Sequence, residues 1–510
     1  MKFPYIKAAG LAVLLTLSAC DDDFLEQYDP NAVSTAQYFK TEGDVLMAVN
    51  GVYQSLRSSN TIGEGSYLFT DERSDDAGRN DNQSNAGEPF QFNDFSLLPS
   101  NTYLKNHWVA MYGAISRCNT VLTNMEQVTF SNEATKAQYQ AEVKFVRALL
   151  YFHLVRKWGD IPLVTRQLRT SDEVAANTFR EKQEVVYGQI VADLKEVVAS
   201  PLPDRQTGAG TGRVSKTAAN ALLGQVYLTM ATTIDPASRS SNLQEAKAYL
   251  TAAYGMRPFG QLKELPYADV FDVAKEANNP EIIFQIVNRQ GDVNYSSSIA
   301  ATFQAKGETI NSLKPGTGVG GRASLDLVKE YEEGDPRKEF SVKFAEDPAV
   351  KDWFITKFRD TSPAAGTNGY GGNDWVLMRF ADVILMLAEV HMHLGEEAKA
   401  IEYLDMVRER AKMPTYAEAQ KDPAYSSKFP TLKLAILHER RVELAFERHR
   451  WYDLLRFFST DELVSFFHAK NQADYGTAQL ANFSRKDRYF PIPFDEHKLN
   501  PEKMYQNDGY

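Results

Sequence analysis

The chain has 510 residues, a formal net charge of −11 and only two cysteines, Cys20 and Cys118. An acidic chain without a basic patch argues against nucleic acid as a partner. With two cysteines there is no disulfide framework, so the fold must rest on a hydrophobic core, which a chain of this length can bury.

The first twenty residues have the features of a bacterial lipoprotein leader. Lys2 and Lys7 precede an apolar run over residues 8–17. This run is too short for a permanent membrane-spanning helix, which needs roughly 20 residues. A Leu-Ser-Ala-Cys sequence then ends at Cys20, as in a lipobox. We expect residues 1–19 to be removed and Cys20 to carry several acyl chains, such as palmitate, which anchor stably together. An ordinary secretory leader with an incidental cysteine is the alternative.

Helical periodicity dominates the rest of the chain. Cys118 lies in one of the apolar helical stretches and is expected to be a small buried residue. A short helix is expected at 324–331. The longer predicted helices are residues 44–57, 108–128, 134–158, 184–199, 215–231, 243–254, 376–394, 396–411 and 432–458.

These helices fall into four pairs, at about 44–128, 134–199, 215–254 and 376–411. Leu223 and Gly224, followed by Tyr227, are similar to part of a tetratricopeptide consensus, and residues 394–403 have the same character. The sequence therefore predicts a mainly α fold, with four tetratricopeptide-like helix pairs stacked into a superhelical scaffold.

Two segments lack this periodicity. Residues 61–100 are rich in Gly, Asn, Asp and Ser, and a loop that long inside a compact domain is usually functional. Residues 259–375 hold only short apolar runs, such as 282–286, and are expected to form strands, loops and short helices. We expect one domain over residues 20–510, with a scaffold at about 44–258 and 376–460 and an irregular, loop-rich, ligand-facing part in these two segments.

Several patterns that suggest chemistry have simpler explanations. Residues 316–321 satisfy the Gly-x-Gly-x-x-Gly pattern, but Lys314 and Pro315 precede them instead of a buried strand, so we expect a flexible loop. His438 and His449 lie among alternating Glu and Arg residues, which favours an ion-pair network over a metal site. No motif for nucleophilic or phosphate chemistry stands out, and no carboxylate pair of a glycosidase can be singled out.

The start of the first irregular segment is dense in oxygen ligands. Asp75, Asp76 and Asp81 are candidate ligands for calcium, which binds such groups in loops, although the spacing is not that of an EF-hand. Hydrogen bonding to ligand hydroxyls and a solvated, self-capped loop are the alternatives. No other cofactor is expected.

Several segments, in order along the chain, resemble the SusD/RagB family. The most specific are Arg-Phe-Ala-Asp-Val-Ile-Leu-Met-Leu-Ala-Glu at 379–389 and Glu-Arg-Arg-Val-Glu-Leu-Ala-Phe-Glu at 439–447, which continues to residue 454. The other similar segments are residues 20–25, 147–164, 279–284, 335–337, 490–493 and 500–510.

The resemblance implies a non-catalytic lipoprotein, exposed on the cell surface and anchored to the outer membrane. It implies capture of oligosaccharide or polysaccharide nutrients and their delivery to a SusC-like, TonB-dependent transporter. A peptide-binding, RagB-like protein of the same fold is the alternative, and a surface glycoside hydrolase is a third hypothesis.

In this family the shared motifs are structural, and the positions that contact sugars vary. Sugar sites stack aromatic rings on the apolar faces of sugars and bind hydroxyls with polar side chains. We therefore expect ligand contacts from aromatic and polar side chains in the two irregular segments. They are Tyr67, Asp71, Arg73, Asn82, Phe90 and Phe92 in the first segment and Tyr295, Trp353 and Tyr370 in the second.

Overall fold

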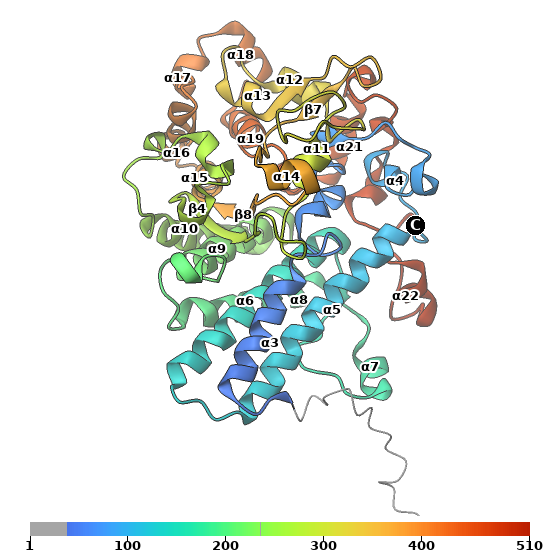
Figure 1. Cartoon of the computed structure of the whole chain (residues 1–510), viewed down its shortest axis with the longest axis vertical. Helices are drawn as coiled ribbons and strands as arrows, with labels where there is room; N and C mark the ends of the chain where they lie inside the picture. Colours follow the sequence, from blue (N-terminus) through green and yellow to red (C-terminus); the bar gives the residue numbers. More distant parts are fainter. Residues whose placement is uncertain (1–37, 235) are drawn as a thin grey trace, which may run out of the picture.

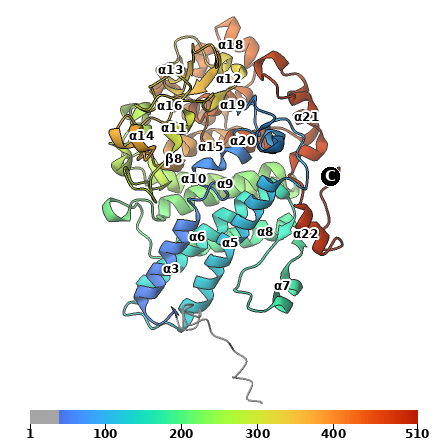
Figure 2. The same cartoon turned by 45° about the vertical axis from the view of Figure 1, so that its right-hand side comes forward.

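The computed structural model describes residues 38–234 and 236–510, so the predicted leader and Cys20 lie outside the described residues. The four predicted helix pairs are confirmed (Figure 1). Each pair also packs against the next, so the pairs form one continuous stack (Figure 2). The pairs are α3 (Glu42–Ser55) with α5 (Thr102–Asn124), α6 (Glu133–Trp158) with α8 (Gln183–Ala199), α9 (Lys216–Thr233) with α10 (Arg239–Gly255), and α15 (Phe380–His393) with α16 (Glu397–Arg410).

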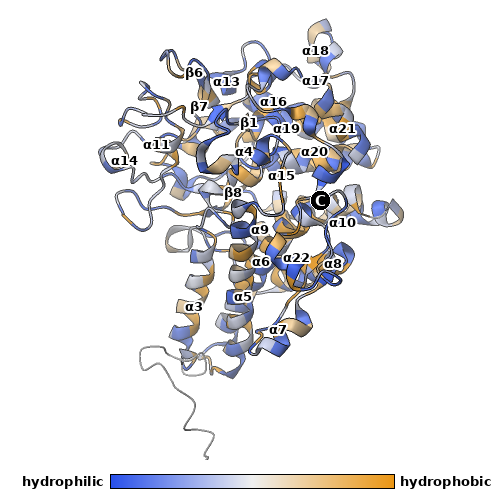
Figure 3. Cartoon of the chain, turned by 90° about the vertical axis from the view of Figure 1, so that its right-hand side faces the viewer, coloured by the Kyte–Doolittle hydropathy of each residue, from blue (hydrophilic) through white to orange (hydrophobic). Residues whose placement is uncertain are grey.

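Side-chain caps decide where several of these helices begin. Thr41 and Asp44 form a capping box at α3, in which each side chain accepts a hydrogen bond from the other residue's backbone N–H. Asn101 accepts from the N–H of Leu104 at 3.0 Å and starts α5 six residues earlier than periodicity predicts. Figure 3 shows hydrophobic and hydrophilic stretches alternating along α3 and α5, as expected for amphipathic helices.

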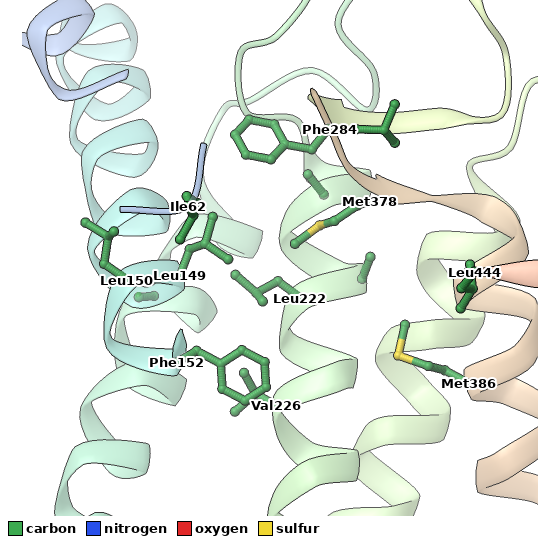
Figure 4. Packing of buried hydrophobic residues seen from close by; sticks show 14 of the residues in the cluster. Ile62, Leu149, Leu150, Phe152, Leu222, Val226, Phe284, Met378, Met386 and Leu444 are labelled. Carbon is green, nitrogen blue, oxygen red and sulfur yellow. The ribbon is translucent and has the colours of Figure 1, made fainter. Parts of the chain in front are cut away.

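The main core lies between the helix pairs. Figure 4 shows Leu149 and Phe152 of α6 facing Leu222 and Val226 of α9, with Phe284 close by. All five side chains are buried. Cys118 is fully buried as predicted.

Gly224 explains the close approach of α9 and α10. A Cβ atom at this position would lie 2.6 Å from Cγ of Leu250 on α10. Only glycine permits this contact, so the Leu-Gly pair of the tetratricopeptide-like pattern has a packing cause.

The predicted strand at residues 282–286 is confirmed as β4 (Ile282–Ile286). It pairs antiparallel with β8 (Trp375–Arg379), with Gln285 opposite Val376. The prediction that the helix at 376–394 begins at residue 376 is therefore wrong, because residues 376–379 form this ladder and α15 begins at Phe380.

The predicted helix at 432–458 is interrupted. The chain forms α19 (Leu432–Glu443) and α20 (Arg450–Phe457), and between them Phe446 and Arg448 take positive φ values of 64° and 67°. The break turns the carbonyls of Glu443 and Ala445 toward the Nζ of Lys357, which is buried and donates to both. Tertiary contacts thus override a helical pattern that is continuous in sequence.

The irregular part joins the two segments that lack periodicity. A four-stranded sheet has the order β1 (Ala77–Gly78), β5 (Arg322–Ala323), β7 (Trp353–Ile355), β6 (Val342–Phe344), and β1 comes from the first segment. Around it lie α11 (Ile299–Phe303), α12 (Leu325–Glu330), α13 (Pro336–Ser341) and α14 (Pro363–Asn368) (Figure 1). The first segment also contains α4 (Phe90–Asn93), and residues 66–78 are almost entirely buried, so this part is packed rather than a free loop.

Residues 316–321 are not a phosphate loop. They lie against residues 303–306, and a Cβ at Gly316 would come within 2.3 Å of the carbonyl oxygen of Ala305. Close packing therefore requires the glycine.

The remaining elements lie mostly at the edges of the stack. No helix in the described ranges is both long and apolar enough to cross a membrane. The remaining elements at the edges of the stack are α7 (Ser171–Asn177), α17 (Tyr416–Ala419), α18 (Pro423–Lys428), α21 (Thr460–His468), α22 (Phe494–Leu499), β2 (Ile161–Pro162) and β3 (Arg180–Glu181).

Candidate functional site

The two most specific sequence motifs form a buried ion-pair network. Arg379 donates to Glu281 at 2.8 Å, to Glu443 at 2.6 Å and to Glu447 at 2.7 Å, and all four side chains are almost fully buried. Arg337 on α13 adds a further contact to Glu443 at 3.0 Å. The motifs therefore fasten α15, α19 and the irregular part together and do not face a ligand.

The predicted ion-pair network around His438 is confirmed. Its Nδ1 lies 3.2 Å from Glu330 and its Nε2 lies 3.1 Å from Glu332. His438, Glu332 and Glu439 bring their ligand atoms within 4.8 Å of one another, a spacing that could hold a metal ion. However, Arg408 pairs with Glu332 at 2.8 Å and with Glu439 at 3.0 Å, so a guanidinium already supplies the positive charge.

Four candidate ligand contacts are wrong because their side chains are buried in the core. Arg73 is 0% exposed and lies over the rings of Phe95 and Phe490. Burial raises the pKa of Asp71 to about 8. The other two are Phe90 and Phe92, which belong to hydrophobic clusters and are 8% and 0% exposed.

The three candidate calcium ligands are engaged by other partners. Asp75 accepts from Arg450 at 2.7 Å and Asp76 accepts from Arg441 at 2.7 Å, so buried guanidinium groups compensate both carboxylates. Asp81 is exposed, and it accepts instead from the backbone N–H groups of the second and third residues after it. The three carboxylates do not converge on a common point.

Tyr67, Trp353 and Asn82 lie in two different places. Tyr67 is mostly buried and packs edge-on against Phe303, with ring centroids 5.1 Å apart. Trp353 is half-buried on β7, and its neighbour Asp352 accepts from Asn80 at 3.2 Å. We call the surface around Trp353 and the Asn80–Asp352 contact the β7 surface, and Asn82 is exposed two residues after Asn80.

Tyr295 and Tyr370 come from loops that the structure joins. The N–H of Gly291 donates to the carbonyl of Tyr370 at 2.9 Å, and residues 297 and 371 form a backbone bridge. Glu64 fixes the same loop from the first irregular segment, since it accepts from the Ser297 hydroxyl at 2.5 Å. Tyr295 remains 46% exposed although its loop is held on both sides.

Tyr295 borders a cleft of about 290 Å³. The cleft lies between the end of α3, the loop at 209–213 and the end of β4, and we call it the α3 cleft. Its volume is close to the lower end of small-molecule sites. Its polar lining includes Asn50, Gln54, Arg57 and Arg213, and Val287 and Tyr295 form part of the rim.

Arg57 organises one wall of the α3 cleft. It donates to the carbonyl of Val287 at 2.5 Å and to Oδ1 of Asn288 at 2.6 Å, and its Cζ lies 5.4 Å from the ring centroid of Tyr295. Asn288 is held in turn by Asp374, whose pKa burial raises to about 7. No carboxylate of the described chain forms an ion pair with Arg57, and partial burial lowers the pKa of this guanidinium.

Arg213 and Tyr53 form the floor. Arg213 pairs with the buried Glu142 at 2.8 Å and donates to Oδ1 of Asn50 at 3.0 Å. The Tyr53 hydroxyl donates to Glu142 at 2.6 Å, while the Tyr53 ring lies 5.3 Å from the Arg213 guanidinium. These contacts fix the polar groups before any ligand arrives.

Sequence reasoning missed Arg57, Arg213 and Asn50. Arg57 and Asn50 lie in or beside a predicted scaffold helix, and Arg213 lies in a short connection. The irregular segments alone could not indicate them, because only the fold brings α3 against residues 287–295. The α3 cleft can stack an aromatic face and donate hydrogen bonds, which suits a polar ligand with apolar faces.

Two family models match separate parts of the chain. One, described as the SusD family, matches residues 343–510, and the other, described as "Starch-binding associating with outer membrane", matches residues 23–228. The chain is 27% identical to SusD-like protein P2 of Formosa agariphila over 528 residues, an alignment that covers 99% of each chain. It is also 23% identical to a SusD-like protein of Bacteroides ovatus, covering 92% of this chain and 85% of the relative.

Solved structures of the same fold are also similar. A laminarin-binding SusD-like protein matches with a TM-score of 0.73 and 26% identity over 92% of this chain and 100% of that chain. Surface glycan-binding protein A from Bacteroides thetaiotaomicron, in complex with laminarihexaose, also matches with a TM-score of 0.73 over 92% of this chain and 100% of that chain. At 21% identity, this second likeness shows the fold alone.

Proposed function

Since the chain belongs to the SusD-like family, we propose that it binds oligosaccharide or polysaccharide nutrients in the α3 cleft, without catalysis, and delivers them to a SusC-like, TonB-dependent transporter. The lipobox-like sequence at Cys20 supports a lipid anchor, and the family description names association with the outer membrane. The protein would thus be tethered where such a transporter is embedded.

The observation that carries this proposal is the half-exposed ring of Tyr295 beside fixed donors. Sugars present apolar C–H faces that stack on aromatic rings, and their hydroxyls accept hydrogen bonds from guanidinium and amide groups. Arg57 and Asn50 supply such groups within the same cleft. Their pre-existing contacts lower the entropy lost when a ligand binds.

Two further observations favour carbohydrate binding without turnover. One of the similar solved structures is that of a SusD-like protein that binds laminarin, a glycan. In addition, the side chains of the described residues that line the α3 cleft include no carboxylic acid, whereas glycoside hydrolysis commonly uses a pair of them.

The test is isothermal titration of the mature chain with neutral β-glucan and α-glucan oligosaccharides and with peptides. We expect saturable binding of at least one oligosaccharide, weakened by Tyr295→Ala and unchanged by Trp353→Ala on the β7 surface. Binding of peptides alone would support the RagB-like alternative and overturn the proposal.

A further inference from the structure

A second cavity lies at the C-terminal end of the chain and shares no residue with the α3 cleft. It has a volume of about 600 Å³ and lies between the end of α6, the strand β3, the start of α8 and the C-terminal segment. Figures 1 and 2 show this end of the chain beside α22, away from α3 and β4. We call it the basic pocket, lined among others by Arg180, Gln183, Arg485, Lys486, Arg488 and Tyr489.

Most charges around the basic pocket are already paired. Lys182 pairs with Asp160 at 2.8 Å and Lys486 pairs with the buried Asp487 at 2.8 Å. On the exposed rim, the remaining pair is formed by Arg485 and Asp461. These pairs carry no net charge toward a ligand.

Arg180 is different, because its partners are neutral. It donates to the backbone carbonyls of Asp160 and Tyr505 at 2.7 and 2.6 Å and to Oδ1 of Asn507 at 2.6 Å. Four hydrogen-bond acceptors, counting the carbonyl of Trp158, hold the guanidinium in place without cancelling its charge. Arg180 therefore leaves a fixed positive charge at one wall of the pocket.

Arg488 supplies a second uncompensated charge. Its Nη1 is buried and finds no acceptor among the described residues, and its Cζ lies 5.9 Å from the ring centroid of Tyr489. A buried N–H group needs an acceptor, which a water molecule or a ligand atom must supply. The lining contains one exposed carboxylate, that of Asp508, against these two guanidinium groups. The pocket is therefore electropositive, although the net charge of the chain is −11.

We propose that the basic pocket binds an acidic saccharide through its carboxylate or sulfate group, with Arg488 as the contact residue. A guanidinium presents parallel N–H donors that match two oxygens of one oxoanion. The volume exceeds the size of a free ion and lies within the range of small-molecule sites. The ring of Tyr489 and the amide of Gln183 offer contacts to the body of a sugar. This site is additional to the α3 cleft.

The experiment titrates the mature chain with an oligogalacturonate, a sulfated oligosaccharide, a neutral oligosaccharide of matched length and inorganic sulfate. In Arg488→Gln we expect at least about a tenfold loss of affinity for the acidic sugars, because the charge-assisted bonds are lost. Arg117→Gln removes the same charge from an exposed position on α5 outside the pocket lining; it is the matched control and should change this affinity less than about twofold. Thermal melting checks that both variants fold, and Arg488→Lys, which keeps the charge, should retain part of the binding.

Binding of the acidic sugars should also weaken as NaCl rises from about 50 to about 500 mM, because salt screens the attraction. Equal affinity of Arg488→Gln and the unaltered chain would overturn the proposal. So would equal binding of inorganic sulfate alone, or loss of acidic-sugar binding in Tyr295→Ala. Neutral-sugar binding, which tests the α3 cleft, is read separately and should not change in Arg488→Gln.

Discussion

Arg57 holds its guanidinium carbon 5.4 Å from the ring centroid of Tyr295, although one residue follows a scaffold helix and the other lies in the irregular part. The same guanidinium donates to the backbone of the Tyr295 loop at Val287. A single side chain thus couples the scaffold to the exposed ring of the α3 cleft.

Replacing Arg57 should lower the affinity for the glycan. In Arg57→Met we expect affinity to fall about fivefold to tenfold, because Tyr295 and Asn288 lose the group that positions them. Isothermal titration measures the effect. Arg289→Met is the control, since Arg289 lies on the same loop with an 80% exposed side chain. If both variants bind alike, Arg57 does not position the ring.

The buried network around Glu443 should dominate stability. Although burial opposes ionisation, Arg410, Arg379 and Arg337 hold the pKa of Glu443 far below its usual range. Glu443→Gln leaves buried guanidinium groups uncompensated, so we expect a loss of about 3–5 kcal/mol in the free energy of unfolding. Urea titration checks this value.

Glu402→Gln is the matched control for this loss, because Glu402 forms an exposed pair with Lys399. Its expected cost is below about 1 kcal/mol. Similar costs for the two variants would mean that the network contributes no more than a surface ion pair.

Two helical glycines should respond oppositely to alanine. Gly224→Ala pushes a Cβ against Leu250 between α9 and α10 and should cost about 1–3 kcal/mol. Gly188 in α8 has no atom within 4 Å of an added Cβ, so Gly188→Ala should stabilise by about 0.5–1 kcal/mol. Thermal melting of the two variants measures these changes in stability. Stabilisation by Gly224→Ala would contradict the proposed packing role.

Glu276 should make stability depend on pH. Burial, with the nearby charge of Asp374, raises the pKa of Glu276 to about 9. The folded state therefore keeps a proton on Glu276 that the unfolded state releases near pH 4.5. The stability that this difference provides is fully present below pH 4.5 and is lost as the pH rises through 9.

Glu276→Gln keeps an acceptor for the Asp374 N–H, which lies 2.8 Å away, but cannot ionise. We expect its free energy of unfolding to fall less than that of the unaltered chain between pH 6 and 10. Denaturation series at fixed pH values measure this, with exposed Glu184→Gln as the control. Parallel curves for Glu276→Gln and the unaltered chain would rule out the titration of Glu276.

The helix pairs could be predicted because their apolar spacing and caps are local properties of the sequence. The exceptions are residues whose partners lie far along the chain. Residues 376–379 become a strand because β4 pairs with them, and residues 444–449 leave the helix where the buried Lys357 binds the carbonyl of Ala445. No local pattern carries this information.

The same reason limits prediction of the site. Asp75 resembles an exposed loop ligand in sequence, but Arg441 and Arg450, far along the chain, bury and neutralise it. Conversely, Arg57 follows a helix without any distinguishing pattern, and only the tertiary fold places it beside Tyr295. Tyr295 could be proposed from the sequence because an aromatic residue stands out in a polar, irregular segment.

Titration of Tyr295→Ala and Trp353→Ala with a glycan that the unaltered chain binds tests the central claim most directly. Loss of the ring in the α3 cleft should lower affinity at least about tenfold, whereas loss of the ring on the β7 surface should change it less than about twofold. Unchanged affinity in Tyr295→Ala, together with a loss in Trp353→Ala, would contradict the assignment and move the glycan site to the β7 surface.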